Sequence, residues 1–71
     1  MSELTVSFGL KVRKQRKLKK ISQERLALLC NIDRSYMGRI ERGEVNLTIE
    51  KIYELAKCLN VSPKDLLPDD V

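Results

Sequence analysis

The stretch Ser22–Gly43, with the sequence SQERLALLCNIDRSYMGRIERG, decides the fold. It opens on Ser22, a hydroxyl residue of the kind that caps helix N-termini by accepting a hydrogen bond from a free backbone N–H. Apolar residues then recur at i, i+3 and i+4, which is the spacing of one buried helix face: Leu26, Leu29 and Cys30. The first part of the stretch therefore predicts a helix over about 23–30.

A second helix is predicted over about 34–42, after a tight turn at Asn31-Ile32. Asp33 is a capping residue whose charge also suits the positive end of a helix dipole. Gly43 has the residue type and position that end helices. The inward face by spacing holds Met37, Ile40 and Glu41, and the outward face holds Arg34, Ser35, Tyr36 and Arg39. Two short helices at a fixed angle on a basic domain are typical of proteins that read the DNA major groove.

Three further helices complete a predicted all-α fold of five helices, which forms one domain over 1–71. The helix over about 6–19 has a start near Thr5 or Ser7 and a thin apolar stripe of Phe8, Val12 and Leu18. Thr48 caps the helix over 49–59, and its expected buried face comprises Ile49, Ile52, Tyr53, Ala56 and Leu59. Ser62-Pro63, a cap followed by proline at the first helical position, opens a short helix over 63–67.

Composition and charge describe a small basic domain. Seventy-one residues suffice for one domain with a thin stability margin, and 42% hydrophobic content is too high for a disordered chain. The net charge of +4 is uneven: residues 1–20 carry seven Lys or Arg against one acid, and residues 61–71 carry one Lys against three acids. This asymmetry predicts a binding pole for an anionic partner, with a solvated helix face as the alternative.

Several classes of function find no support in the sequence. The chain has no His and only two cysteines, so we expect no metal and no cofactor. Cys30 is interpreted as a small core residue in preference to a redox residue, and Cys58 as partly exposed. No catalytic constellation or Gly-rich phosphate loop is present, so we do not expect an enzyme. The chain also lacks a signal-peptide pattern and an apolar run of about 18 residues, so we expect no membrane contact and a cytoplasmic location.

Together with Asn46-Leu47-Thr48, the Ser22–Gly43 stretch resembles the helix-turn-helix domains of the Cro and phage-repressor class. The resemblance runs from Phe8 to Leu67 and implies a λ-repressor-like fold. It is closest to the controller proteins of restriction–modification systems, which share the segments Asp33-Arg34-Ser35-Tyr36 and Ile40-Glu41-Arg42. Controller-like proteins both repress their own promoter and activate a neighbouring gene, which makes RNA polymerase a further expected partner.

The resemblance also implies roles for matching residues. The positions expected to read base edges are Arg34, Ser35 and Arg39. Those expected to contact the DNA backbone are Gln23, Tyr36, Asn46 and Thr48. Arg16 resembles the partner of Glu41 in a semi-buried ion pair that ties the first helix to the recognition helix. Val45 departs from the pattern because related controllers often carry Arg there, so the resemblance implies no loop contact at this position.

The residue types themselves leave some roles open. The planar fork of Arg34 can bond guanine O6 and N7 together. Arg39 fits a base edge or a phosphate, and Tyr36 fits a DNA contact or a ring packed against the turn. Gly38 is unfavourable in a helix, which fits either a close approach to another helix or to DNA, or a tolerated surface glycine.

Homodimerisation on a near-palindromic double-stranded operator is expected, because one recognition helix offers too little surface for strong specificity. The apolar residues after the fourth helix have little core left to enter and are expected to form the self-complementary interface with help from the helix over 49–59: Val61, Leu66 and Leu67. The main alternative function is a protein-interaction module, such as an antitoxin or an adaptor with the same helices. RNA binding is less well supported, because aromatic stacking platforms are lacking.

Overall fold

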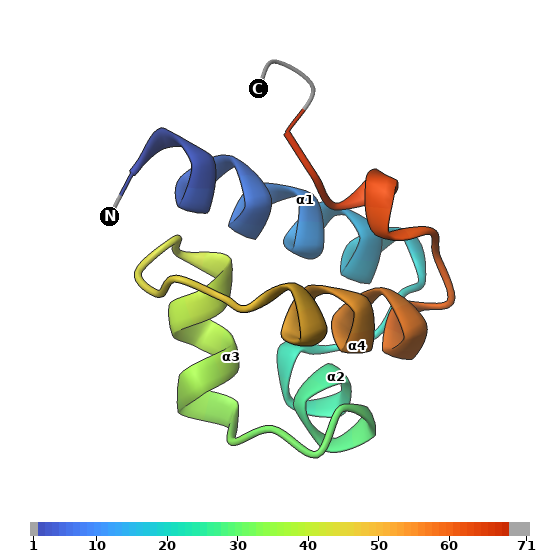
Figure 1. Cartoon of the computed structure of the whole chain (residues 1–71). Helices are drawn as coiled ribbons and strands as arrows, with labels where there is room; N and C mark the ends of the chain where they lie inside the picture. The colour runs from blue at the N-terminus through green and yellow to red at the C-terminus, as the bar shows by residue number, and fades with distance from the viewer. Residues whose placement is uncertain (1, 69–71) are drawn as a thin grey trace.

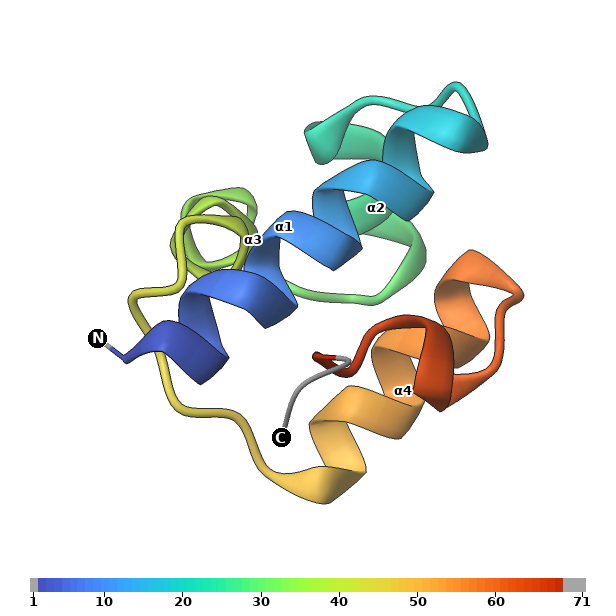
Figure 2. The ribbon, with the colours of Figure 1, turned by 90° about the horizontal axis from the view of Figure 1, so that it is seen from above.

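Four α-helices and one short 3₁₀ turn make up residues 2–68, the part of the chain that the computed structural model describes. The elements are α1 (Glu3–Leu18), α2 (Gln23–Leu29), α3 (Arg34–Glu41), α4 (Ile49–Leu59) and η1 (Pro63–Asp65). Figure 1 shows α3 running toward α1, so that the C-terminal end of α3 lies near α1 and its N-terminal end lies on the opposite side of the molecule. From above, α1 crosses over α2 and α3, while α4 and η1 lie to one side (Figure 2).

The prediction of a fifth helix over 63–67 is wrong. Ser62 and Pro63 do start a turn as expected, and the Asp65 side chain accepts a hydrogen bond from the Ser62 backbone N–H at 3.0 Å. The following amides, however, donate to carbonyls three residues back: Asp65 to Ser62, Leu66 to Pro63 and Leu67 to Lys64. This is the 3₁₀ pattern, and Pro68 has no N–H with which to continue it. The segment therefore forms a single turn.

Helix α1 starts three residues earlier than the sequence analysis predicted. Ser2 is its N-cap, and Ser2 and Thr5 form a capping box in which each side chain accepts a hydrogen bond from the other residue's backbone N–H. The Thr5 hydroxyl also donates to the carbonyl of Gly43 at 2.9 Å. Thr5 thus lies inside the first turn of α1 and connects it to the loop after α3.

The core is aliphatic except for one ring, and every helix contributes to it. Its fully buried members come from all four helices and from the residue after η1: Phe8, Val12, Leu26, Ala27, Met37, Ile40, Leu55, Ala56, Leu59 and Leu66. The prediction that Leu66 has little core to enter is therefore wrong, since its side chain is 0% exposed. The 3₁₀ turn directs Leu66 back onto α4, which closes the core at that end.

The predicted buried face of α4 is only partly correct. Ala56 and Leu59 are buried as expected, and Ile52 packs partly against the core. Ile49 and Tyr53, however, are 73% and 61% exposed. The helix carries two apolar stripes, and Leu55 with Leu59 (i, i+4) occupies the inward one. Leu18 and Leu29, which were also expected to be buried, are 63% and 48% exposed, because each lies in the last turn of its helix.

Gly9 marks the closest approach of α1 to α3. A Cβ atom there would lie 2.5 Å from the backbone carbonyl oxygens of both Ile40 and Glu41. Neither oxygen can move without displacing the end of α3. The glycine therefore permits the contact between the two helices.

We expect Gly9→Ala to destabilise the protein by roughly 1–3 kcal/mol, because the added methyl overpacks a backbone contact. Gly38→Ala is the matched control. Its Cβ would meet only flexible side-chain ends, Arg42 Nη1 at 3.1 Å and Gln23 Oε1 at 3.4 Å. In a helix interior, alanine is also more favourable than glycine by about 1 kcal/mol of folding free energy. Denaturant unfolding followed by circular dichroism measures both, and equal stability of Gly9→Ala and wild type would contradict the account of this contact.

Candidate nucleic-acid interface

The turn between α2 and α3 is built by backbone hydrogen bonds. Asn31 adopts a left-handed conformation with φ of 55°, which ends α2 and redirects the chain. The Ile32 amide then donates to the carbonyl of Ala27 at 2.9 Å, and the Ile32 side chain packs against the core. Asp33 follows as the N-cap of α3. The angle between the two helices is therefore set by residues that contact the core.

The first turn of α3 presents Arg34 and Ser35 to solvent. Both residues are exposed, and Arg39, one turn further along, has 52% of its side chain exposed. Met37, Ile40 and Glu41 are buried on the opposite side, as their spacing predicted. The three residues predicted to read base edges thus lie on the outer side of one helix.

Ser35 is held by the N-cap. Its backbone N–H donates to Asp33 Oδ2 at 3.0 Å, and its hydroxyl donates to the same carboxylate oxygen. These bonds, the hydroxyl bond first, lower the pKa of Asp33 below its ordinary value. Because the Ser35 proton is directed to Asp33, the hydroxyl oxygen is left to accept a hydrogen bond from outside.

Glu44 forms an ion pair with Arg42 and lies close to Arg39. Arg42 Nε donates to Glu44 Oε2 at 2.6 Å, whereas Arg39 Nε lies 3.8 Å from Glu44 Oε1. The hydrogen bond from Arg42 is the first cause of the lowered pKa of Glu44. Arg42 is thus occupied, while the contact of Arg39 is longer than a hydrogen bond and leaves its terminal nitrogens available.

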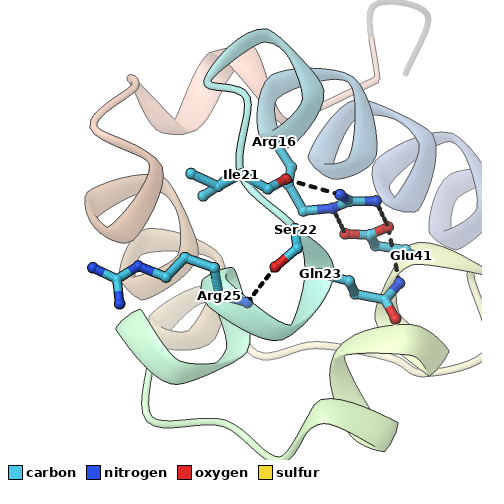
Figure 3. A network of polar contacts seen from close by, with 6 residues as sticks. All are labelled: Arg16, Ile21, Ser22, Gln23, Arg25 and Glu41. Carbon is cyan, nitrogen blue, oxygen red and sulfur yellow. Dashed lines mark hydrogen bonds and ion pairs between the residues drawn. The ribbon is translucent and has the colours of Figure 1, made fainter.

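Beneath the exposed face, Glu41 receives hydrogen bonds from two other elements (Figure 3). Arg16 from α1 donates through Nε to Oε2 at 2.7 Å and through Nη2 to Oε1 at 3.0 Å. Its third nitrogen, Nη1, donates to the carbonyl of Ile21 at 3.0 Å. The side chains of Arg16 and Glu41 are 11% and 4% exposed. The pair that the resemblance implied is therefore present, bidentate and nearly enclosed.

Gln23 completes this network. Its Nε2 donates to Glu41 Oε1 at 3.1 Å, and its side chain is half-buried. Gly38 is buried beside the Gln23 amide oxygen, but a Cβ there would lie at an ordinary contact distance of 3.4 Å, so this contact does not require glycine. The predicted phosphate contact of Gln23 must therefore use its second amide N–H, because Glu41 takes the first.

The remaining backbone-contact residues lie around this surface. Tyr36 is half-buried and packs against the core, which agrees with the interpretation of a ring packed by the turn, and this packing leaves the role of its hydroxyl open. Asn46 is exposed in the loop after α3. Thr48 caps α4 by accepting from the Lys51 amide at 3.1 Å, which leaves its own hydroxyl proton for another acceptor. Val45 packs partly against the core.

The three residues predicted for a dimer interface have different environments. Leu66 is 0% exposed in the protein's own core, so its side chain is not available to a partner. Val61 is half-buried against the same core, and Leu67 is 41% exposed. The sequence analysis missed Ile49 and Tyr53, which it assigned to the core. The i, i+4 spacing of these two residues was the signal for a second apolar stripe.

We call the exposed residues Ile49, Tyr53 and Leu67, together with the half-buried Pro63, the α4 apolar patch. These residues line a hollow of about 420 Å³ between α4 and η1.

Among residues 2–68 no helix is long and apolar enough to cross a bilayer. The same residues include no group of three or more His, Cys, Asp or Glu placed to hold a metal ion.

Comparison with known proteins agrees with this geometry. The family described as helix-turn-helix matches residues 12–66. Control protein C.BamHI of Bacillus amyloliquefaciens is 43% identical over 67 residues, which are 93% of this chain and 83% of that protein. The chain belongs to the helix-turn-helix family of control proteins. The predicted resemblance is thus confirmed.

Solved structures of controller proteins have the same fold. The restriction–modification controller protein C.AhdI from Aeromonas hydrophila superposes with a TM-score of 0.84 at 43% identity, over 89% of this chain and 96% of that one. C.Esp1396I, solved as a tetramer in complex with its natural 35-base-pair operator, gives a TM-score of 0.81 at 39% identity, over 87% of this chain and 82% of that one.

We expect Glu41→Gln to lower the free energy of unfolding by roughly 3–5 kcal/mol, because it leaves the enclosed Arg16 guanidinium without a counter-charge. Glu44→Gln makes the same chemical change in the exposed pair with Arg42, where solvent screens the charges, and should have little effect. Denaturant unfolding of both variants measures the difference. Equal effects would show that enclosure of the Arg16 pair adds nothing.

Proposed function

We propose that the protein is a sequence-specific transcription regulator that binds double-stranded DNA as a homodimer on a near-palindromic operator. The observation that carries this proposal is the exposure of Arg34 and Ser35 in the first turn of α3. The buried ion pair between Arg16 and Glu41 holds this helix in place. In helix-turn-helix proteins this end of the second helix contacts base edges. The relatives are control proteins, and one was solved on its operator.

The proposed base-reading residues differ in what they can recognise. Within residues 2–68 no hydrogen bond or ion pair competes for the Arg34 guanidinium, which suits a bidentate contact with guanine. Ser35 offers an acceptor, because its proton goes to Asp33, so it suits the amino groups of adenine or cytosine. Arg39 retains both alternatives, a base edge or a phosphate, since only its Nε faces Glu44.

Contacts to the DNA backbone are proposed for residues at both ends of this surface. They are the second amide N–H of Gln23, the hydroxyls of Tyr36 and Thr48, and the side chain of Asn46. Such contacts position a protein on the duplex without reading its sequence.

We further propose that the protein acts as both repressor and activator. Glu24, which is exposed on α2, is the candidate contact to RNA polymerase. We also propose a cytoplasmic location, which is supported by the bacterial source of the relative C.BamHI.

The homodimer is proposed to form through the α4 apolar patch together with Val61, in place of the interface centred on Leu66. Ile49 and Tyr53 are 73% and 61% exposed and line the same hollow as Leu67, and a contiguous exposed apolar surface is typical of a protein contact site. The same face on two subunits would form an isologous contact. The relative C.Esp1396I assembles as a tetramer on its operator, which supports an oligomeric mode of binding.

Arg34→Ala should lower discrimination at one base pair of each half-site by roughly 5- to 150-fold, the equivalent of about 1–3 kcal/mol. The operator is first recovered by selection from randomised duplex DNA, and binding to it and to single-base variants is measured by fluorescence anisotropy. Arg13→Ala on the exposed side of α1 is the matched control and should preserve the base preference. Unchanged preference in Arg34→Ala would favour the protein-interaction alternative, an antitoxin or an adaptor.

Leu67→Asp should convert the dimer to monomer without unfolding the chain, because the side chain is 41% exposed. Leu28→Asp places the same charge on a leucine of α2 that is 69% exposed and lies outside the α4 apolar patch, so this control should remain dimeric. Sedimentation at micromolar concentration measures both. A wild-type protein that is only monomeric there would refute the dimer.

A further inference from the structure

The two cysteines lie together where α2 and α4 end. Cys30 is the C-cap of α2, and Cys58 lies in the last turn of α4. Cys58 Sγ is 3.7 Å from the backbone carbonyl oxygen of Leu29, the residue directly before Cys30. Both cysteines are partly exposed and pack against the same core. Residues that are 28 positions apart in the sequence are therefore neighbours in the fold.

The Cys58 thiol also affects the protonation of Cys30. Burial raises the pKa of the Cys30 thiol above its ordinary value, and a hydrogen bond with the Cys58 thiol raises it further. Lys51 and Glu54 act on Cys30 in opposite directions, with Lys51 favouring the thiolate and Glu54 opposing it. Cys30 thus keeps its proton beside the Cys58 sulfur.

Both cysteines lie close to the end of a helix. Asn31 follows Cys30 with φ of 55°, and Asn60 comes two residues after Cys58 with φ of 57°. Because the regular hydrogen bonds of α2 and α4 stop there, a backbone adjustment at either cysteine disturbs fewer of them than one in a helix centre.

We propose that Cys30 and Cys58 form a reversible intramolecular disulfide that joins α2 to α4 when the protein meets a small-molecule disulfide. Cys58 loses its thiol proton to solvent, and its sulfur attacks one sulfur of the reagent and releases the other sulfur as a thiolate, which leaves a mixed disulfide on Cys58. The Cys30 sulfur then loses its proton to solvent or to that thiolate and attacks Cys58 Sγ. This step releases the second thiol, so two cysteine thiols are oxidised and one reagent disulfide is reduced to two thiols.

The bond would close a ring that contains the recognition helix. The 27 residues between Cys30 and Cys58 include the turn, the whole of α3, the loop after it and most of α4. Cross-linking a loop of this length restricts the unfolded chain more than the folded one. The oxidised protein should therefore be more resistant to unfolding, and this property is independent of whether it binds DNA.

The test uses the full chain incubated with excess glutathione disulfide and then freed of reagent. We expect the intact mass to fall by two hydrogen atoms, the mobility on a non-reducing gel to remain that of a monomer, and Tm to rise by roughly 10 °C or more. Reduction with dithiothreitol should reverse all three. Cys30→Ser should keep glutathione bound at Cys58, and neither Cys30→Ser nor Cys58→Ser should gain Tm on oxidation.

Three results would overturn the proposal. Stable glutathione adducts on the wild-type chain would show that Cys30 does not reach the mixed disulfide. A covalent dimer on the non-reducing gel would show that Cys58 or Cys30 pairs between subunits. An internal disulfide that lowers Tm would show that the bond forms only after local unfolding. Because no readout involves DNA, failure here is distinct from failure of the proposed function.

Discussion

The fold depends on the enclosed contact between the Arg16 guanidinium and the Glu41 carboxylate. One carboxylate receives bonds from α1 and, through Gln23, from α2, while belonging itself to α3. The remaining Arg16 nitrogen holds the carbonyl of Ile21, in the connection between α1 and α2. A buried carboxylate without these partners would be strongly unfavourable. Rotation of α3 about its axis would separate them, so the pair determines which residues of α3 face outward.

Because this ion pair fixes the inner side of α3, the residues on its exposed side can be polar or charged without loss of packing. Arg34, Ser35 and Arg39 contribute little to packing, so they are free to differ among proteins with the same inner face. Glu44 adds a local influence, since it occupies Arg42 and lies beside Arg39. Glu44 thus engages the guanidinium of Arg42, whereas the terminal nitrogens of Arg39 remain available for an outside contact. The residues proposed to give selectivity and the buried residues that stabilise the fold lie on opposite sides of one eight-residue helix.

The positive charges on α1 lie far from the first turn of α3 and act over a longer distance than the contacts described above. Arg13, Lys14 and Lys17 line the exposed side of α1 with Leu10 and Leu18, whereas the first turn of α3 lies on the side of the molecule away from α1 (Figure 1). These cations are therefore suited to long-range attraction of an anionic duplex more than to direct contact. The apolar residues after α4 also differ in their environments: Leu66 closes the core, whereas the α4 apolar patch is the surface at which we propose the dimer contact.

Local sequence rules determined much of this protein. The caps at Ser22, Asp33 and Thr48, the inward spacing of Met37 and Ile40, and the exposure of Arg34 and Ser35 follow from hydrogen-bonding capacity and helix period alone. The Arg16–Glu41 pair came from family resemblance, because its partners are 25 residues apart and no periodicity connects them. Tertiary structure alone decided which apolar stripe of α4 faces inward and that Leu66 enters the core. It also brought Cys30 and Cys58 together, since contacts between distant elements depend on how helices pack and leave no local signal in the chain.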